Sequence, residues 1–209
     1  MKGIILAGGQ NKRIGANKAQ LKLGDKTVIE WVTHSLLQVF PEVIIVTNSP
    51  KLYEGLGCQA TRDLFPAKGS IVGLYSGLMA SFSQHNFFVA CDMPFINCNL
   101  IRYLVDLTEQ EGDTFDLVIP KTDRGYQPLH AVYSRSCLPR VKKQLEEGNL
   151  KILDLFPYLK IREVGHEELI RFDPQLLSFF NINTVSDWHR ALTLYPDFLA
   201  RRRNPDVSI

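Results

Sequence analysis

The 209-residue sequence predicts an α/β domain with an open, mainly parallel sheet and helices on both faces. Short runs of β-branched and other apolar residues, such as Val43 to Val46, alternate with segments whose apolar residues recur at helical spacing. The alternation continues through the first 120 residues, and it is typical of parallel strands joined by crossover helices. Ligands of such sheets bind beyond the carboxyl ends of the strands.

The first predicted strand is Lys2 to Ala7, an apolar run without polar alternation. It ends in the double glycine Gly8-Gly9, which Arg13 and Lys18 follow. Adjacent glycines allow the backbone to approach a ligand closely, and two cations nearby suggest an anion such as a nucleotide phosphate. A simple tight turn with solvated side chains is the alternative, and the spacing matches neither the dinucleotide-binding nor the P-loop motif.

The following elements are also predicted from periodicity and composition. They are a short strand at Leu21 to Leu23, a helix from Thr27 to Phe40 ended by Pro41, strands at Val43 to Val46 and Gln59 to Arg62, and a helix from about Ser70. Gly73 and Gly77 interrupt that last helix, at a cost of roughly 1 kcal/mol each relative to alanine. We therefore expect its backbone to approach a neighbouring strand or a ligand closely.

The second half continues the alternation and then becomes harder to interpret. We expect strands at Phe87 to Cys91, Leu117 to Ile119, Leu129 to Tyr133, Lys160 to Val164 and Phe179 to Asn183, with helices at Leu100 to Val105, Ser136 to Leu145 and Val185 to Leu194, the last capped by Thr184 or Ser186. No repeat or linker is evident. The chain is therefore predicted to form one domain over residues 1–195, followed by a flexible basic tail over 196–209.

Composition excludes several classes of function. Lys+Arg total 24 and Asp+Glu total 22, so no field of the whole molecule favours nucleic acid or a membrane as a partner. The four cysteines form no close pair, which argues against a disulfide framework or a cysteine zinc site and favours the cytoplasm. No apolar stretch reaches the length of a signal peptide or a membrane span. The five histidines lack paired spacing, so core or surface roles are expected for them.

Gly8, Asn48, Asp63 and Asp92 each follow a predicted strand, so we expect them along one rim of the sheet. Taken singly, each has a structural alternative as a helix cap or a turn residue. Together with Lys18 they indicate a nucleotide site. A carboxylate facing a nucleotide requires a cation, and Mg²⁺ typically binds one or two carboxylates plus phosphate oxygens. Asp92 is the best metal candidate, and Asp63 is suited to accept hydrogen bonds from a base or ribose.

These residues resemble a known family. The stretch Leu6 to Lys18 is similar to the L-A-G-G-x-x-x-R-M-G-x-x-K signature of the molybdenum cofactor guanylyltransferases, the MobA family of the nucleotide-diphospho-sugar-transferase-like superfamily. Further matching blocks are Asp63, Gly69 to Gly73, Cys91 to Phe95, Gln127 to Leu129 and Asn181 to Thr184. Ile14 and Ser70 depart from the pattern, where the family has methionine and proline.

The resemblance implies a Rossmann-like three-layer α/β/α domain and an Mg²⁺-dependent nucleotidyltransferase that joins the GMP part of GTP to molybdenum-molybdopterin and releases pyrophosphate. It implies GTP contacts from Leu6, Ala7, Gly8, Gly9, Lys18, Asn48, Asp63 and Asp92, a triphosphate contact from Arg13, and a metal on Asp92. Arg13, Lys18 and Asp92 are the implied catalytic residues, and Gln127, Asn181 and Asn183 lie toward the pterin. Transient contact with molybdenum insertion proteins and molybdoenzyme chaperones is also expected.

Two alternatives stay open at this stage. Related cytidylyltransferases tend to read L-A-A-G, so the missing methyl group at Gly8 favours the larger guanine ring on steric grounds. A nucleotidyltransferase of the same fold that uses CTP or a sugar phosphate is the first alternative. A GTP-binding module without catalytic activity is the second.

Overall fold

The computed structural model describes residues 1–8, 17–110 and 114–203 and contains one eight-stranded sheet. The strands are β1 (Lys2–Leu6), β4 (Val43–Val46), β5 (Gln59–Thr61), β6 (His85–Ala90), β7 (Leu117–Thr122), β8 (Gly125–Tyr126), β9 (His130–Ser134) and β10 (Ile161–Val164). Their order is β10-β7-β9-β6-β1-β4-β5, with β8 paired to β7. Only β9 and β8 run antiparallel to their neighbours, so the expected mainly parallel sheet is confirmed.

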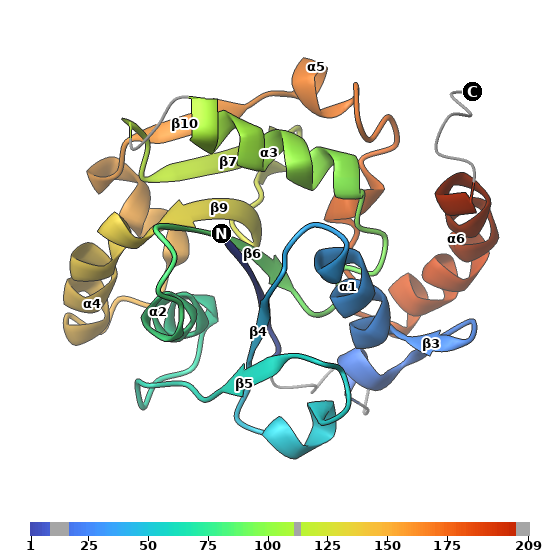
Figure 1. Cartoon of the computed structure of the whole chain (residues 1–209), viewed down its shortest axis with the longest axis horizontal. Helices are drawn as coiled ribbons and strands as arrows, with labels where there is room; N and C mark the ends of the chain where they lie inside the picture. The colour runs from blue at the N-terminus through green and yellow to red at the C-terminus, as the bar shows by residue number, and fades with distance from the viewer. Residues whose placement is uncertain (9–16, 111–113, 204–209) are drawn as a thin grey trace.

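Helices cover both faces of this sheet. They are α1 (Val28–Leu37), α2 (Ser70–Ala80), α3 (Cys98–Gln110), α4 (Leu138–Glu146), the short α5 (His166–Leu169) and α6 (Val185–Arg203). One buried cluster joins α1 and α3 to the sheet, and a second joins α2 and α4 to the opposite face. Figure 1 shows these two pairs of helices on opposite sides of the strands, so the expected three-layer arrangement is also confirmed.

Consecutive residues of β1 explain why its sequence lacks polar alternation. Ile5 belongs to the cluster under α1 and α3, whereas Ile4 belongs to the cluster under α2 and α4. Gly77 of α2 lies so close to this strand that an added Cβ would come within 2.8 Å of the Ile4 and Phe88 side chains. A Cβ on Gly73 would meet Leu6 at 3.0 Å. The two helix glycines therefore allow α2 to pack closely on the sheet, and no ligand is needed to explain them.

A third buried cluster joins α6 to α1 and to the two-stranded hairpin of β2 (Lys22–Leu23) and β3 (Lys26–Thr27). Trp31 lies at its centre, with its ring 5.9 Å from that of Phe198 and its Nε1 donating to the Leu23 carbonyl over 2.8 Å. Thr27 precedes α1 as its N-cap and forms a reciprocal capping box with Glu30. Figure 1 shows α6 beside this hairpin, outside the three layers.

Two expectations for the last third are wrong. The helix expected over Val185 to Leu194 continues to Arg203 as α6, because Phe198 buries its side chain in the third cluster. The strand expected at Phe179 to Asn183 is instead the last residue of a 3₁₀ turn (Leu177–Phe179) followed by irregular backbone. The amide of Ile182 donates to the Asp92 carbonyl over 3.0 Å, and no strand ladder forms there.

Other differences are smaller. The strand expected over Leu117 to Ile119 continues to Thr122, because β8 pairs with its last two residues as an antiparallel hairpin. Thr184 is the cap of α6, with its hydroxyl accepting from the Asp187 amide over 3.1 Å. No helix in the described ranges is long and apolar enough to cross a membrane.

Candidate functional site

The predicted rim exists, and the sheet order sets the sequence of residues along it. β6, β1, β4 and β5 are adjacent and parallel, so Asp92, Gly8, Asn48 and Asp63 follow one another at their carboxyl ends. The antiparallel β9 begins at the same edge, beyond β6, where the Ala90 amide donates to the Leu129 carbonyl over 3.2 Å. The rim thus runs from the segment before β9 to the end of β5.

At the β5 end, Asn48 and Asp63 form a reciprocal pair. The Asn48 amide donates to Asp63 Oδ2 over 2.7 Å, and the Asp63 backbone amide donates to Asn48 Oδ1 over 3.3 Å. A Cβ added to Gly8 would lie 3.5 Å from Asp63 Oδ2, which is an ordinary contact. The described residues therefore leave room for a side chain at position 8, and Asp63 Oδ2 is the group nearest to it.

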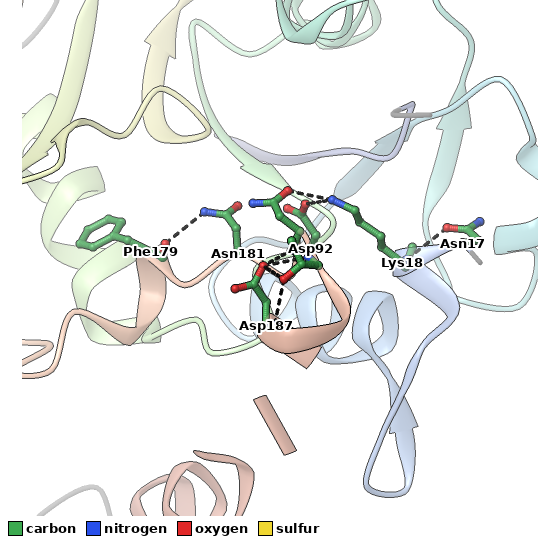
Figure 2. A network of polar contacts seen from close by, with 9 residues as sticks. Asn17, Lys18, Asp92, Phe179, Asn181 and Asp187 are labelled. Atoms are coloured by element: carbon green, nitrogen blue, oxygen red, sulfur yellow. Dashed lines mark hydrogen bonds and ion pairs between the residues drawn. The ribbon is translucent and has the colours of Figure 1, made fainter. Parts of the chain in front are cut away.

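Near the β6 end, Lys18 reaches Asp92 from a different part of the chain. Lys18 begins a 3₁₀ turn (Lys18–Gln20), and Asn17 caps the turn by accepting from the Ala19 amide over 3.1 Å. The Lys18 ammonium lies 2.8 Å from Asn183 Oδ1 and 3.5 Å from Asp92 Oδ2. Figure 2 shows the contacts of Lys18 with Asn183 and Asp92 as dashed lines.

Asp92 is mostly buried, with 17% of its side chain exposed. Burial raises the pKa of this carboxyl, and the nearby Lys18 acts in the opposite direction. Its Oδ1 is fully enclosed and has no hydrogen-bond partner among the described residues. A buried carboxylate oxygen without a partner is costly unless a cation or a donor meets it.

The donor set suits a metal that is shared with a substrate. The described residues contain no group of three or more histidine, cysteine, aspartate or glutamate side chains placed to hold an ion. Mg²⁺ commonly binds through one or two carboxylates and completes its shell with phosphate oxygens and water. Asp92, with its unpaired oxygen, fits that kind of site.

The irregular segment before α6 lies next to Asp92, where the Ile182 amide donates to the Asp92 carbonyl. Asp187 Oδ2 accepts from the backbone amides of Asn183 and Thr184 over 3.0 and 2.8 Å. Ile182 is fully buried in the third cluster. These contacts fix the backbone that carries Asn183. The sequence had assigned this residue to the pterin side only through the family resemblance.

The other two residues assigned to the pterin side lie elsewhere on the rim. Gln127 precedes β9, where its side-chain amide donates to Thr122 Oγ1 over 3.1 Å and to the Gly125 carbonyl over 3.2 Å. Asn181 donates to the Phe179 carbonyl over 3.1 Å, and in Figure 2 that contact points away from Lys18. The contacts described here do not link either side chain to Lys18 or Asp92.

Of the remaining predicted residues, Leu6 and Ala7 have structural contacts. The Leu6 side chain packs so closely on α2 that a Cβ added to Gly73 would lie 3.0 Å from it. The Leu6 carbonyl accepts from the Cys91 amide over 3.1 Å. Ala7 donates its amide to the Val46 carbonyl over 2.8 Å. Gly9 and Arg13 lie outside the described residues.

Sequence analysis missed Asn17 and Asp187, which hold the backbone on either side of the Lys18–Asn183 contact. The signal for Asp187 was present, since Thr184 and Asp187 have the spacing of a capping box at a helix start. The predicted structural role of the histidines is confirmed for His130, which is fully buried and packs edge-on against Phe87 and Phe179.

A cavity of about 360 Å³ lies away from this rim, between the β2–β3 hairpin, α1 and α6. Its lining residues are Asp25, Lys26, Trp31, His34, Leu199 and Arg202. Asp25 and Lys26 already pair with each other over 2.9 Å. None of the residues that follow the sheet strands reaches this cavity, so we place the candidate site at the rim.

Comparison with known proteins shows the family of the chain. Residues 3–160 match the family model of the MobA-like NTP transferase domain. The chain is 37% identical over 190 residues to a molybdenum cofactor guanylyltransferase of Desulfosudis oleivorans, covering 90% of this chain and 93% of that protein. It is also 37% identical over 192 residues to a probable molybdenum cofactor guanylyltransferase of Natranaerobius thermophilus, with the same coverage.

A solved structure with similar sequence supports the fold. The crystal structure of molybdopterin-guanine dinucleotide biosynthesis protein A from Archaeoglobus fulgidus superposes with a TM-score of 0.83 at 33% identity. The superposition covers 94% of this chain and 100% of that one. The likeness therefore extends beyond the residues of the family model.

Proposed function

The chain belongs to the MobA-like NTP transferase family, and from this we propose that it transfers GMP from GTP to molybdenum-molybdopterin. The products are the molybdopterin guanine dinucleotide cofactor and pyrophosphate. The observation that carries the proposal is the pairing, on one rim, of a half-buried Asp63 beside an exposed Gly8 with a buried Asp92 beside Lys18. The first pair suits a base, and the second suits a triphosphate with a cation.

The reaction requires little acid–base chemistry from the protein. An oxygen of the terminal phosphate of molybdopterin attacks the α-phosphorus of GTP, and the bond from that phosphorus to the bridging α–β oxygen breaks. Pyrophosphate leaves with the electron pair. Because a phosphate monoester has its second pKa at about 6, the attacking group is mostly dianionic at neutral pH and needs no general base. Positioning two anions and stabilising charge is then the main task of the site.

Asp92 is the residue that we propose to hold Mg²⁺. When bound, this ion would neutralise charge on the triphosphate and orient the leaving pyrophosphate. The enclosed Oδ1 of Asp92 supports the assignment, because it has no other partner among the described residues. The Lys18 ammonium lies 3.5 Å from Asp92, and we propose that it contacts phosphate oxygens when the nucleotide binds.

We assign the base to the other end of the rim. Asp63 keeps Oδ2 in its contact with Asn48 and has a second oxygen to accept from the donors of a guanine. Gly8 has no side chain, so the space beside Asp63 is open: an added Cβ would lie 3.5 Å from Asp63 Oδ2. Gln127 and Asn181, toward β9, are proposed for the pterin side, and Gly9 and Arg13 for the phosphates.

The nucleotide and the acceptor can be tested in one assay. The protein is incubated with Mg²⁺, molybdenum cofactor and GTP labelled on either the α- or the γ-phosphate. We expect the α label in a dinucleotide and the γ label in pyrophosphate. Pyrophosphate formed only from CTP would favour the cytidylyl alternative, and tight GTP binding without turnover would favour a binding module. Cytoplasmic location and transient contact with molybdoenzyme chaperones stay predictions, which cell fractionation and affinity capture with defined partners would test.

A further inference from the structure

We propose that Ser76, a buried serine of α2, is a positioning residue for the nucleotide base and that it acts through Asp63. Its hydroxyl holds the backbone next to Asp63 at a fixed place on the rim, so that one oxygen of the Asp63 carboxylate meets the base. The inference rests on the proposed function, because it concerns the residue to which we assign guanine. It adds a determinant of base binding that lies behind the rim, in the helix layer.

The backbone that carries Asp63 is held at two adjacent amides. Residues 63–68 form neither helix nor strand. The Asp63 amide donates to Asn48 Oδ1 over 3.3 Å, and the Leu64 amide donates to Ser76 Oγ over 2.9 Å. The other backbone amides of this segment have no acceptor among the described residues. The Leu64 side chain is 55% exposed, so the place of this residue depends mainly on the hydrogen bond to Ser76.

Ser76 itself has a fixed position. It is fully buried, and its hydroxyl donates to the Val72 carbonyl over 2.8 Å, so the same oxygen can only accept from Leu64. The next residue, Gly77, packs so closely on β1 that an added Cβ would lie 2.8 Å from the Ile4 side chain. The acceptor for the Leu64 amide is therefore held by a helix turn that is itself seated tightly on the sheet.

The same face of α2 contacts the other side of the proposed base site. Gly73 lies three residues before Ser76 and so neighbours it on the helix surface. A Cβ on Gly73 would lie 3.0 Å from the side chain of Leu6, which is two residues before Gly8. Ser76 holds the residue after Asp63. One helix thus contacts the ends of β1 and β5, on either side of β4, and sets how far apart Gly8 and Asp63 lie.

Asn48 completes the arrangement from the neighbouring strand end. Its amide donates to Asp63 Oδ2 over 2.7 Å, and Oδ1 has no hydrogen bond or ion pair with a described residue. We assign Oδ1 to a donor of the base. Its place depends on where the backbone is held, and a shift of about 1 Å takes a hydrogen bond out of range. Loss of the Ser76 hydroxyl should therefore weaken base binding, although Ser76 touches no ligand.

A double-mutant cycle tests this route through Asp63. The variants are Ser76→Ala, Asp63→Ala and the two combined, and GTP affinity is measured by calorimetry with Mg²⁺ and without the second substrate. We expect Ser76→Ala to weaken GTP binding roughly fivefold, the loss typical of one neutral hydrogen bond. In the Asp63→Ala background the same change should have no further effect, because the group it acts through is gone. In turnover, KM for GTP should rise and kcat should stay unchanged.

Ser35→Ala is the matched control for a lost buried hydroxyl. Ser35 is fully buried in α1, donates to the Trp31 carbonyl four residues earlier over 3.0 Å and accepts from Arg202 over 2.9 Å. Its loss should leave GTP affinity unchanged. Tripolyphosphate, which has the phosphates of GTP and no base, gives the matched ligand. Its affinity, measured by competition with GTP, should be equal in the native protein and in Ser76→Ala.

A second variant removes the donor in place of the acceptor. Leucine at position 64 is replaced by its α-hydroxy acid through nonsense suppression, which changes the Leu64 amide to an ester and keeps the exposed side chain. The same roughly fivefold loss of GTP affinity is expected, again absent in the Asp63→Ala background. This variant decides the question if Ser76→Ala does not fold by circular dichroism.

Unchanged GTP affinity in Ser76→Ala would overturn the inference, and so would equal losses in both backgrounds or an equal loss for tripolyphosphate. A native protein that binds GTP but makes no dinucleotide would overturn the proposed function, while the cycle would still decide the role of Ser76. Absence of GTP binding by the native protein would overturn both.

Discussion

The two carboxylates of the rim are held in opposite ways. Asp63, at the β5 end, is half-buried and shares two hydrogen bonds with the exposed Asn48. Asp92, at the β6 end, is mostly buried, and one of its oxygens is enclosed without a partner among the described residues. The same residue type at equivalent positions of two parallel strands thus meets two different environments, so a shared position in the fold does not imply a shared task.

The difference arises from what covers each strand end. The end of β6 continues into Met93 and Phe95, both buried, and receives the Ile182 amide from the segment before α6. β5 lies at the edge of the sheet, where only Asn48 of the neighbouring strand end meets Asp63 in the described contacts. A covered carboxylate is suited to a cation, since low exposure strengthens charge interactions. A carboxylate at an open edge is suited to hydrogen bonds that discriminate between ligands.

Asp92→Asn should have the largest effect on activity. The substitution keeps the shape of the side chain and removes its charge, so a cation would lose its only protein carboxylate in the proposed site. We expect kcat to fall roughly 10³-fold, which corresponds to several kcal/mol of lost charge stabilisation. Folding should be retained, because a neutral amide is easier to bury than a carboxylate. Steady-state kinetics and thermal unfolding check this, and unchanged turnover would remove Asp92 from the metal site.

Asp63→Ala should have a smaller effect, on binding rather than on the chemical step. Loss of a hydrogen bond from a charged acceptor to the base should weaken GTP binding roughly 10- to 100-fold. We expect KM for GTP to rise while kcat at saturation changes little. Asp106→Ala, which removes an exposed carboxylate from α3, is the control for lost surface charge. A fall in kcat like that of Asp92→Asn would show that the two carboxylates share one task.

Gly8→Ala tests the base more finely. The new methyl group would lie in ordinary contact with Asp63 Oδ2, so the described residues leave room for it. If guanine occupies the space beside Gly8, the ratio of kcat/KM for GTP to that for CTP should fall roughly tenfold, as is typical of one extra carbon in a binding pocket. Competition between the two nucleotides measures the ratio. An unchanged ratio would mean that the base is chosen elsewhere.

The sequence predicts the part of the site that is built by strands and helices, whose apolar residues recur in regular patterns. Continuous apolar runs at β1, β4 and β6 follow from burial on both faces, and they fix where Gly8, Asn48 and Asp92 emerge. The helix glycines Gly73 and Gly77 also indicated close packing in advance. Local patterns suffice here because strand order and crossover direction are strongly restricted in such folds.

The part that sequence did not predict depends on contacts between distant segments. The chain from Phe179 to Asn183 reads as an apolar strand, but the Asp92 carbonyl and the third buried cluster hold it as irregular backbone. The Lys18–Asn183 contact joins residues 165 positions apart. The periodicity of neighbouring residues carries no information about a contact between such distant segments. The length of α6 was missed for a similar reason, because Phe198 packs against Trp31 of α1 and Phe95, both far from it in the sequence.

His130, on β9 beside β6, is a buried polar residue for which we expect no part in the reaction. Like Asp92 it is buried and has unpaired polar atoms, since neither ring nitrogen has a partner among the described residues. Unlike Asp92 it is enclosed by the rings of Phe87 and Phe179 at 5.0 and 5.1 Å. Burial alone lowers its pKa to about 3. We therefore expect a structural effect from this residue and none on turnover.

His130→Leu should leave kcat at neutral pH unchanged and make the protein less sensitive to acid. Below pH of about 6.5 the unfolded chain protonates this histidine, whereas the folded chain does so only near pH 3. The unfolded state then binds more protons, so the native protein loses up to about 1.4 kcal/mol of stability for each pH unit of acidification in that window. The leucine variant lacks this loss. Urea unfolding from pH 7 to 4 measures the two slopes, with exposed His189→Gln as the control. Equal slopes for the native protein and His130→Leu would mean that the His130 ring is protonated in the folded state.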